Sequence, residues 1–76
     1  MPVAFVMINA KIDAMEKVLK ALAKVEGVKE AYSLYGVYDV IVKVEADSMD
    51  KINDLVSYKI RRVDGVNSTL TMIVIE

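Results

Sequence analysis

The chain contains one pattern twice. Residues 15–18 (Met-Glu-Lys-Val) are echoed by residues 49–52 (Met-Asp-Lys-Ile), and residues 25–28 (Val-Glu-Gly-Val) are echoed by residues 63–66 (Val-Asp-Gly-Val). Each copy combines the apolar spacing of an amphipathic helix with a glycine that ends the helix and an apolar strand that follows. The duplication therefore predicts two helix–strand units of the same design.

An apolar, strand-like segment also precedes each copy. Residues 3–10 come before the first helix and residues 38–46 before the second, whereas residues 28–35 and 66–75 follow the helices. The order is βαββαβ, so we expect an α+β ferredoxin-like fold with a four-stranded antiparallel sheet. Two helices of this size cover one face of such a sheet.

Local signals mark where the two helices begin. Asp13 precedes the first helix, with Glu16 three residues later in the spacing of a capping box. Asp47 or Ser48 is expected to cap the second helix. The second copy is four residues longer between its shared blocks, which predicts about one extra helical turn.

The length and the missing residue types restrict how the fold is stabilised. The 76 residues leave room for a single domain, residues 1–76, and a chain of this size is marginally stable alone. Cysteine and histidine are absent, which excludes disulfides and the commonest zinc ligands. We therefore expect neither a metal nor a cofactor, and self-association becomes the expected source of added stability.

Two of the predicted strands are apolar on both faces. Residues 3–8 are apolar at every position, and residues 70–75 are apolar at every position except Thr71. An antiparallel sheet with one face in water would alternate apolar and polar residues. Since the helices cover one face, we expect a second copy of the sheet to cover the other, which gives a dimeric α/β barrel. Edge effects in short strands would produce the same pattern without a dimer.

The charge distribution argues against binding to nucleic acid or to membranes. The net charge is −1, and the densest basic group, Lys59 with Arg61 and Arg62, lies at a predicted helix end, where cations suit the helix dipole. Binding to phosphates would need a larger cluster of cations. No segment approaches the ~18–20 apolar residues of a membrane span, and no signal peptide is recognisable. We expect a cytoplasmic protein.

Few residues offer catalytic chemistry. A serine or threonine nucleophile would have neither a histidine nor a cysteine as its partner. Glu45 and Asp47 lie at a strand-to-helix turn, where helix capping accounts for them. The three glycines are scattered singly, so no phosphate-binding loop is present. We therefore predict that the chain is not an enzyme.

One constellation offers ligand chemistry: residues 35–39 (Tyr-Gly-Val-Tyr-Asp) together with residues 68–71 (Ser-Thr-Leu-Thr). Gly36 at the turn can adopt a positive φ and point successive backbone N–H groups at an anion. Asp39 follows, and a carboxylate beside N–H donors matches the ammonium and carboxylate of an α-amino acid. Turn chemistry and the preference of threonine for strands explain the same residues without a ligand.

Residues 35–40, 63–66 and 68–74 resemble the effector domain, also called the RAM domain, of the leucine-responsive/AsnC transcriptional regulators. The resemblance covers nearly the whole chain. Domains of that family form dimeric α/β barrels, the dimers assemble further, often into octamers, and amino-acid effectors bind between dimers. The resemblance implies a ligand site formed by Gly36, Val37, Tyr38 and Asp39, with Ser68, Thr69 and Thr71 nearby and Tyr35 as a further member.

The chain departs from that family in one respect. A full-length regulator carries a helix-turn-helix domain ahead of this one, whereas Met1 here stands almost directly before the first predicted strand. We therefore expect a stand-alone effector domain without a DNA-binding domain. Its expected partners are an amino acid, other copies of itself and full-length regulators of the family. Two alternatives stay open: a structural oligomerisation module without a ligand, and a small enzyme with a pocket inside each barrel.

Overall fold

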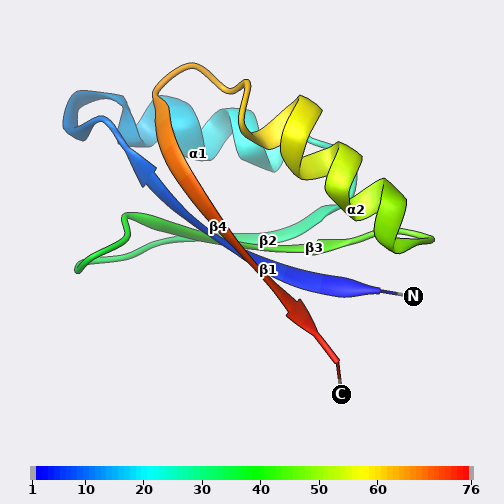
Figure 1. The fold of residues 1–76 in the computed structure, drawn as a ribbon. Coiled ribbons are helices and arrows are strands. Elements are labelled where there is room, and N and C mark those ends of the chain that lie inside the picture. Colours follow the sequence, from blue (N-terminus) through cyan, green and yellow to red (C-terminus); the bar gives the residue numbers. More distant parts are fainter. Residues whose placement is uncertain (1, 76) are drawn as a thin grey trace.

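The computed structural model describes residues 2–75 as one four-stranded sheet with two helices packed on one face (Figure 1). The strands are antiparallel and lie in the order β2-β3-β1-β4, so β1 and β3 are central. Their bounds are β1 (Val3–Ala10), β2 (Val28–Ser33), β3 (Val40–Glu45) and β4 (Val66–Val74). The predicted α+β ferredoxin-like fold is confirmed.

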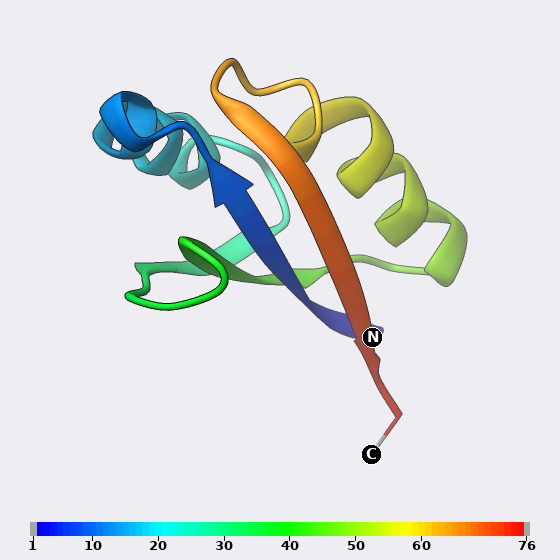
Figure 2. The same ribbon diagram turned by 60° about the vertical axis from the view of Figure 1, so that its left-hand side comes forward.

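The two helices differ in length and in regularity. The first, α1 (Met15–Ala23), follows a 3₁₀ turn, η1 (Ile12–Ala14), and the second, α2 (Met49–Leu55), continues into a π-helical turn, η2 (Val56–Ile60). Figure 2 shows both helices on the same side of the sheet. The extra turn predicted for the second copy is present as η2. Within residues 2–75, no helix is long and apolar enough to cross a membrane.

The predicted N-cap of α2 is confirmed, whereas the predicted N-cap of α1 is wrong. The Ser48 hydroxyl accepts a hydrogen bond of 3.2 Å from the backbone N–H of Lys51, as an N-cap should. At α1, Ala14 occupies the N-cap position and no side chain caps the helix, so the prediction for Asp13 is wrong. The chain turns early because the N–H of Ala14 donates to the carbonyl of Lys11, which places Asp13 inside η1.

A glycine ends each helical region, as predicted. Gly27 and Gly65 have φ values of 98° and 102°, in the left-handed region. Their carbonyls accept equivalent backbone hydrogen bonds of 2.9 Å, from the N–H of Glu45 to Gly27 and from the N–H of Lys11 to Gly65. Lys11 directly follows β1, and Glu45 is the last residue of β3. The chain that leads into each helix is therefore joined to a helix-ending glycine by the same kind of backbone hydrogen bond.

Aliphatic side chains alone fill the layer between the helices and the sheet. The central strands alternate between buried and partly exposed residues along their length, and the buried set faces the helices. No polar or charged side chain of the residues described is buried. The buried residues are Ala4, Val6, Ile8, Ala10, Val18, Leu22, Val40, Val42, Val44, Ile52, Val56 and Ile60.

The opposite face of the sheet, which we call the open face, has no cover in the single chain. Its apolar part lies on the β1–β4 pair, where Phe5 is opposite Met72 and Met7 is opposite Leu70. Leu70 and Met72 are each 45% exposed. Both faces of β1 are therefore apolar from Val3 to Ile8, and β4 adds Leu70 and Met72 to the open face, as the sequence indicates.

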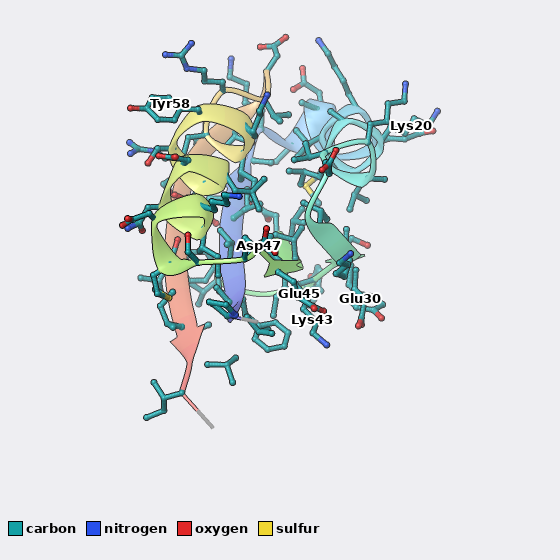
Figure 3. All side chains as sticks on the ribbon, turned by 90° about the vertical axis from the view of Figure 1, so that its right-hand side faces the viewer. Lys20, Glu30, Lys43, Glu45, Asp47 and Tyr58 are labelled. Carbon is teal, nitrogen blue, oxygen red and sulfur yellow. The ribbon has the colours of Figure 1, made fainter. Side chains whose placement is uncertain are left out.

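A polar group occupies the β2 side of the open face. The carboxylate of Glu30 accepts a hydrogen bond of 2.7 Å from the Tyr32 hydroxyl and lies 3.8 Å from Nζ of Lys43 (Figure 3). The hydrogen bond and the negative charge of Glu30 raise the pKa of Tyr32 above its ordinary value. The open face is therefore apolar on one side and polar on the other.

The connection between β2 and β3 is longer than predicted. The sequence suggests a tight turn at Gly36 and Val37, but the strands end earlier and residues 34–39 form a six-residue loop. The backbone N–H of Leu34 donates to the carbonyl of Asp39 at 2.7 Å, which closes the base of the loop. The hairpin itself is antiparallel, as expected.

We predict that Gly65→Ala destabilises the fold by ~1–3 kcal/mol, because an alanine there is both strained and crowded. A Cβ at Gly65 would lie 2.8 Å from Cβ of Ala14 and 2.9 Å from Cγ2 of Val18, at a φ of 102°. Gly36→Ala is the matched control, since Gly36 has no positive φ and a Cβ there meets nothing within 4 Å. Urea unfolding of both variants gives the comparison, and equal stability losses would contradict the argument.

A second prediction concerns pH. Nζ of Lys17 donates a hydrogen bond of 2.7 Å to Oδ2 of Asp64, and this bond, together with the charge of Lys17, lowers the pKa of Asp64 below its ordinary value. The contribution of Asp64 to stability is therefore present above its unfolded pKa and is lost as the pH falls through the lower folded pKa. In Lys17→Met, we expect the pKa of Asp64 to return toward its ordinary value in an NMR titration. An unchanged pKa would mean that the pair does not persist in solution.

Candidate functional site

The two segments singled out by the sequence lie at the same end of the sheet, which we call the hairpin end. Because neighbouring strands are antiparallel, the end of β1 lies beside the start of β3 and the start of β4. The loop of residues 34–39 and residues 66–69 therefore flank residues 8–10 from opposite sides. The sequence spacing alone does not show this, since about 30 residues separate the two segments along the chain.

Asp39 is fixed to the end of β1 by its backbone and its side chain. Its N–H donates to the carbonyl of Ile8 at 2.9 Å, and its Oδ2 accepts a hydrogen bond of 2.9 Å from the N–H of Ala10. The side chain is half-buried. Its other oxygen, Oδ1, makes no hydrogen bond within residues 2–75. Asp39 thus presents a held carboxylate with one oxygen available.

The residues before Asp39 project from the sheet. The Tyr35 and Val37 side chains are 108% and 86% exposed, Gly36 is exposed, and Tyr38 is half-buried. The expectation that Gly36 has a positive φ is wrong. A loop of six residues changes direction gradually, so no residue in it needs the left-handed conformation that a two-residue turn would require.

The β4 residues divide between the two faces of the sheet. The Ser68 hydroxyl, on the open face, accepts a hydrogen bond of 3.2 Å from Nδ2 of Asn9. Thr69 and Thr71 are opposite Ile8 and Val6, whose side chains are buried beneath the helices, so the two threonines point to the helix side. Ser68 and Thr69 belong to the hairpin end, whereas Thr71 lies further along the strand.

A strand separates these hydroxyls from Asp39. Asp39 adjoins β1 on the β3 side and Ser68 adjoins it on the β4 side, so two strand spacings, roughly 10 Å, lie between them. The predicted residues therefore gather at one end of the sheet without lining a common pocket in a single chain.

A hollow of about 370 Å³ at this end is lined by Arg61, Val66, Asn67, Ser68 and Thr69. Arg61 and Asn67 were not identified from the sequence as site residues. The pairing of β1 with β4 is irregular at Asn9 and Ala10, where Ser68 and Val66 are the successive partners, and Asn67 is the extra residue of this bulge. No local sequence signal marks such a bulge, because both partners lie far apart in the chain.

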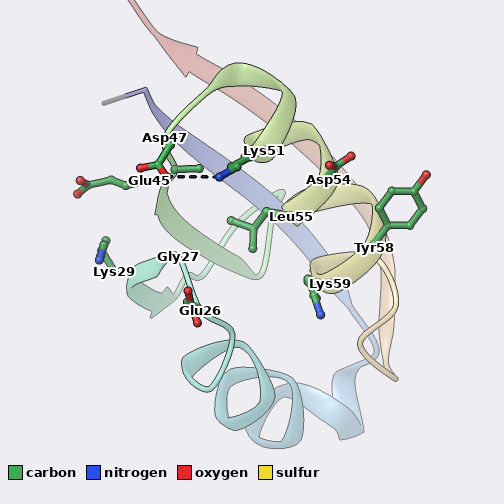
Figure 4. A pocket seen from close by; sticks show the side chains of 11 residues that line it. Glu26, Gly27, Lys29, Glu45, Asp47, Lys51, Asp54, Leu55, Tyr58 and Lys59 are labelled. Atoms are coloured by element: carbon green, nitrogen blue, oxygen red, sulfur yellow. Dashed lines mark hydrogen bonds and ion pairs between the residues drawn. The ribbon is translucent and has the colours of Figure 1, made fainter.

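A larger hollow, of about 620 Å³, lies at the opposite end of the sheet, between α2 and the turn that follows α1 (Figure 4). None of the predicted site residues lines it. Within residues 2–75, no group of three or more histidine, cysteine, aspartate or glutamate side chains comes together as metal ligands would. The hairpin end holds the predicted residues, and the far end holds the larger space.

Comparison with known proteins identifies the family. Residues 3–76 match the model of the Lrp/AsnC ligand binding domain. A homocitrate synthase of Sulfurisphaera tokodaii is 42% identical over 59 residues, covering 78% of this chain and 13% of the enzyme. A helix-turn-helix-type transcriptional regulator of Pyrococcus furiosus is 33% identical over 73 residues, covering 92% of this chain and 49% of the regulator.

Solved structures agree with the sequence comparison. The crystal structure of FFRP-DM1 superposes with a TM-score of 0.94 at 37% identity, covering 99% of this chain and 100% of that one. The chain thus spans half or less of the two sequence relatives but the whole of this structural one. With a family model matching almost its entire length, the chain belongs to the Lrp/AsnC ligand-binding domain family.

Proposed function

We propose that this domain is a regulatory, non-catalytic module that binds a small amino acid at the hairpin end. The observation that carries the proposal is the arrangement of Asp39, whose carboxylate is held by the N–H of Ala10 while Oδ1 stays available to a ligand ammonium. A carboxylate in a fixed position binds a cation without first losing side-chain entropy. The membership in a ligand-binding family supports the same assignment.

A second chain is needed to complete this site. In one chain the hairpin lines neither of the two hollows described above. Three large apolar side chains are almost fully exposed at the hairpin end: Ile12, Tyr35 and Val37. Exposed apolar side chains gathered at one end favour contact with another molecule. Such a contact would enclose the ligand between chains.

The open face supplies the first level of assembly. Covering it with the open face of a second copy would bury the apolar β1–β4 surface, including Leu70 and Met72, in an isologous dimer. The hairpin ends would then be free to join dimers, in a ring such as the octamer that the family resemblance implies. A ligand bound between dimers shifts the assembly toward the form that binds it more tightly.

The relatives suggest two processes that ligand-controlled assembly could regulate. A regulator of the same fold from Neisseria meningitidis, NMB0573, was solved as a complex with L-Met, with a TM-score of 0.89 at 19% identity. The helix-turn-helix-type transcriptional regulator of Pyrococcus furiosus favours control of transcription, through mixed assembly with full-length regulators. The homocitrate synthase relative favours a second candidate, in which the domain regulates an enzyme in response to an amino acid.

We predict that Asp39→Asn abolishes the response to the amino acid that binds at the hairpin end, while the fold persists. The amide oxygen can still accept the hydrogen bond from Ala10, so the loop stays anchored, but the charge that attracts an ammonium is lost. The measurement is a thermal-shift screen of the twenty amino acids, combined with the mass from light scattering. The wild-type chain should show a ligand that raises the Tm and changes the mass.

Asp50→Asn serves as the control, since Asp50 is an exposed carboxylate on α2, away from the hairpin end. It should respond to the ligand as the wild type does. A full response in Asp39→Asn would remove Asp39 from the site. A wild-type chain that is indifferent to every amino acid would favour the structural oligomerisation module instead.

We also predict that Met72→Glu converts the dimer to a monomer. Met72 lies opposite Phe5 in the middle of the apolar part of the open face, and a carboxylate buried there without a partner would cost several kcal/mol. Asn53→Glu, an equal charge change on an exposed position of α2, is the control. Light scattering should give a lower mass for Met72→Glu than for the wild type, and Asn53→Glu should keep the wild-type mass. An unchanged mass would show that the open face is not the dimer contact.

A further inference from the structure

The hollow at the far end of the sheet, which we call the open cleft, differs from the proposed effector site in place and in lining. Its floor is apolar at Leu55 and Gly27, and its rim carries charges of both signs (Figure 4). Ala46 also lines the cleft. The volume of about 620 Å³ falls within the range of small-molecule sites. The charged residues on its lining are Glu26, Glu45, Asp47 and Asp54, with Lys29, Lys51 and Lys59.

The internal duplication shows that this cleft is open where its counterpart is closed. In the repeated pattern, Lys17 and Asp64 of one end correspond to Lys51 and Glu26 of the other. Lys17 and Asp64 are joined by a hydrogen-bonded ion pair of 2.7 Å. Lys51 instead pairs with Asp47 of its own helix start, at 3.4 Å, and forms no ion pair with Glu26. At one end of the domain an ion pair therefore joins the helix to the turn before the neighbouring strand, and at the equivalent end this ion pair is missing.

The position of α2 explains the difference. At the closed end, Gly65 packs against Ala14 and Val18 at the start of α1. At the open end, Gly27 packs against Leu55, at the end of α2. The residue of α2 that corresponds to Val18 is Ile52. The contact of α2 with Gly27, at Leu55, therefore lies three residues further along the helix than the contact of α1 with Gly65, at Val18. The start of α2, with Lys51, is thereby held away from Glu26.

The lining of the open cleft defines the chemistry of a ligand that could take the place of the missing ion pair between Lys51 and Glu26. A carboxylate of the ligand would bind Lys51, and an ammonium would bind Glu26. The lining has one more carboxylate than it has lysines, which favours a ligand with a second ammonium. The apolar floor at Leu55 suits a methylene chain between the charged ends.

We propose that the open cleft is a second ligand site, which binds a small zwitterion of net positive charge, such as a diamino acid, bridging Glu26 and Lys51. This site lies at the opposite end from Asp39, and its occupation does not depend on the assembly of chains. Binding there would join α2 to the turn after α1 in the way that Lys17 and Asp64 join their elements at the closed end.

The three glycines allow a direct test, because one lies at each of the three places concerned. Gly27 lies in the open cleft, Gly65 at its closed counterpart and Gly36 in the hairpin. In protein labelled with ¹⁵N-glycine, addition of L-lysine should shift the Gly27 amide signal and leave the Gly65 signal in place. A Gly27 signal that does not move at millimolar L-lysine, or that moves no more than the Gly65 signal, would overturn the proposal.

Variants separate specific binding from general salt effects. In Lys51→Gln, we expect the affinity for L-lysine at Gly27 to fall by roughly tenfold or more, because a charged hydrogen bond is lost. Lys17→Gln, the matched change at the closed end, should leave that affinity unchanged. Equal affinities in Lys51→Gln and the wild type would overturn the bridging role of Lys51.

The test also distinguishes this site from the effector site. In Asp39→Asn, the response of Gly27 to L-lysine should persist, whatever happens to the Gly36 signal. Loss of the Gly27 shift in Asp39→Asn would show that the cleft has no site of its own and only reports binding at the hairpin end. Retention would show that the cleft binds L-lysine by itself, even if the hairpin end binds no amino acid.

Discussion

The register of β1 between β3 and β4 is the constraint on which the rest of the structure depends. Because side chains alternate along a strand, this register places one aliphatic set of β1 under the helices and the other on the open face. A shift by one residue would exchange the two sets and would separate Asp39 from Ala10. The same register thus determines the core, the face left uncovered in the single chain and the position of the candidate site.

The fold could be predicted from the sequence because its signals are local and repeated. The helix-ending glycines, Gly27 and Gly65, and the alternation in the strands depend on residues close together in the chain. The misses come from interactions across the fold. Asp13 does not cap α1 because it lies inside η1, which is closed by the hydrogen bond from Ala14 to Lys11, and Lys11 is itself hydrogen-bonded to Gly65, 54 residues away.

The candidate site was less predictable for the same reason. The residue types of the hairpin are visible in the sequence, but the length of its loop depends on where β2 and β3 stop pairing. Because the loop is longer than a two-residue turn, Gly36 does not adopt the left-handed conformation that the sequence predicted. The hydrogen bond from Ala10 to Asp39 joins residues 29 positions apart in the chain, and the bulge at Asn67 depends on the pairing of β4 with the distant β1. The open cleft could not be predicted, because the sequences of the two copies do not show which of the equivalent lysine–carboxylate pairs forms in the folded chain.

The purely aliphatic core has a consequence for how such domains diverge. None of its buried side chains depends on a hydrogen-bonding partner, so exchanges among valine, isoleucine and leucine of similar total volume cost little stability, typically less than ~1.5 kcal/mol. Sequences can therefore drift apart while the backbone stays the same. The chemistry of recognition, in contrast, lies on turns and rims outside that core. Natural selection can alter what such a domain senses, and what it is attached to, without redesigning the scaffold.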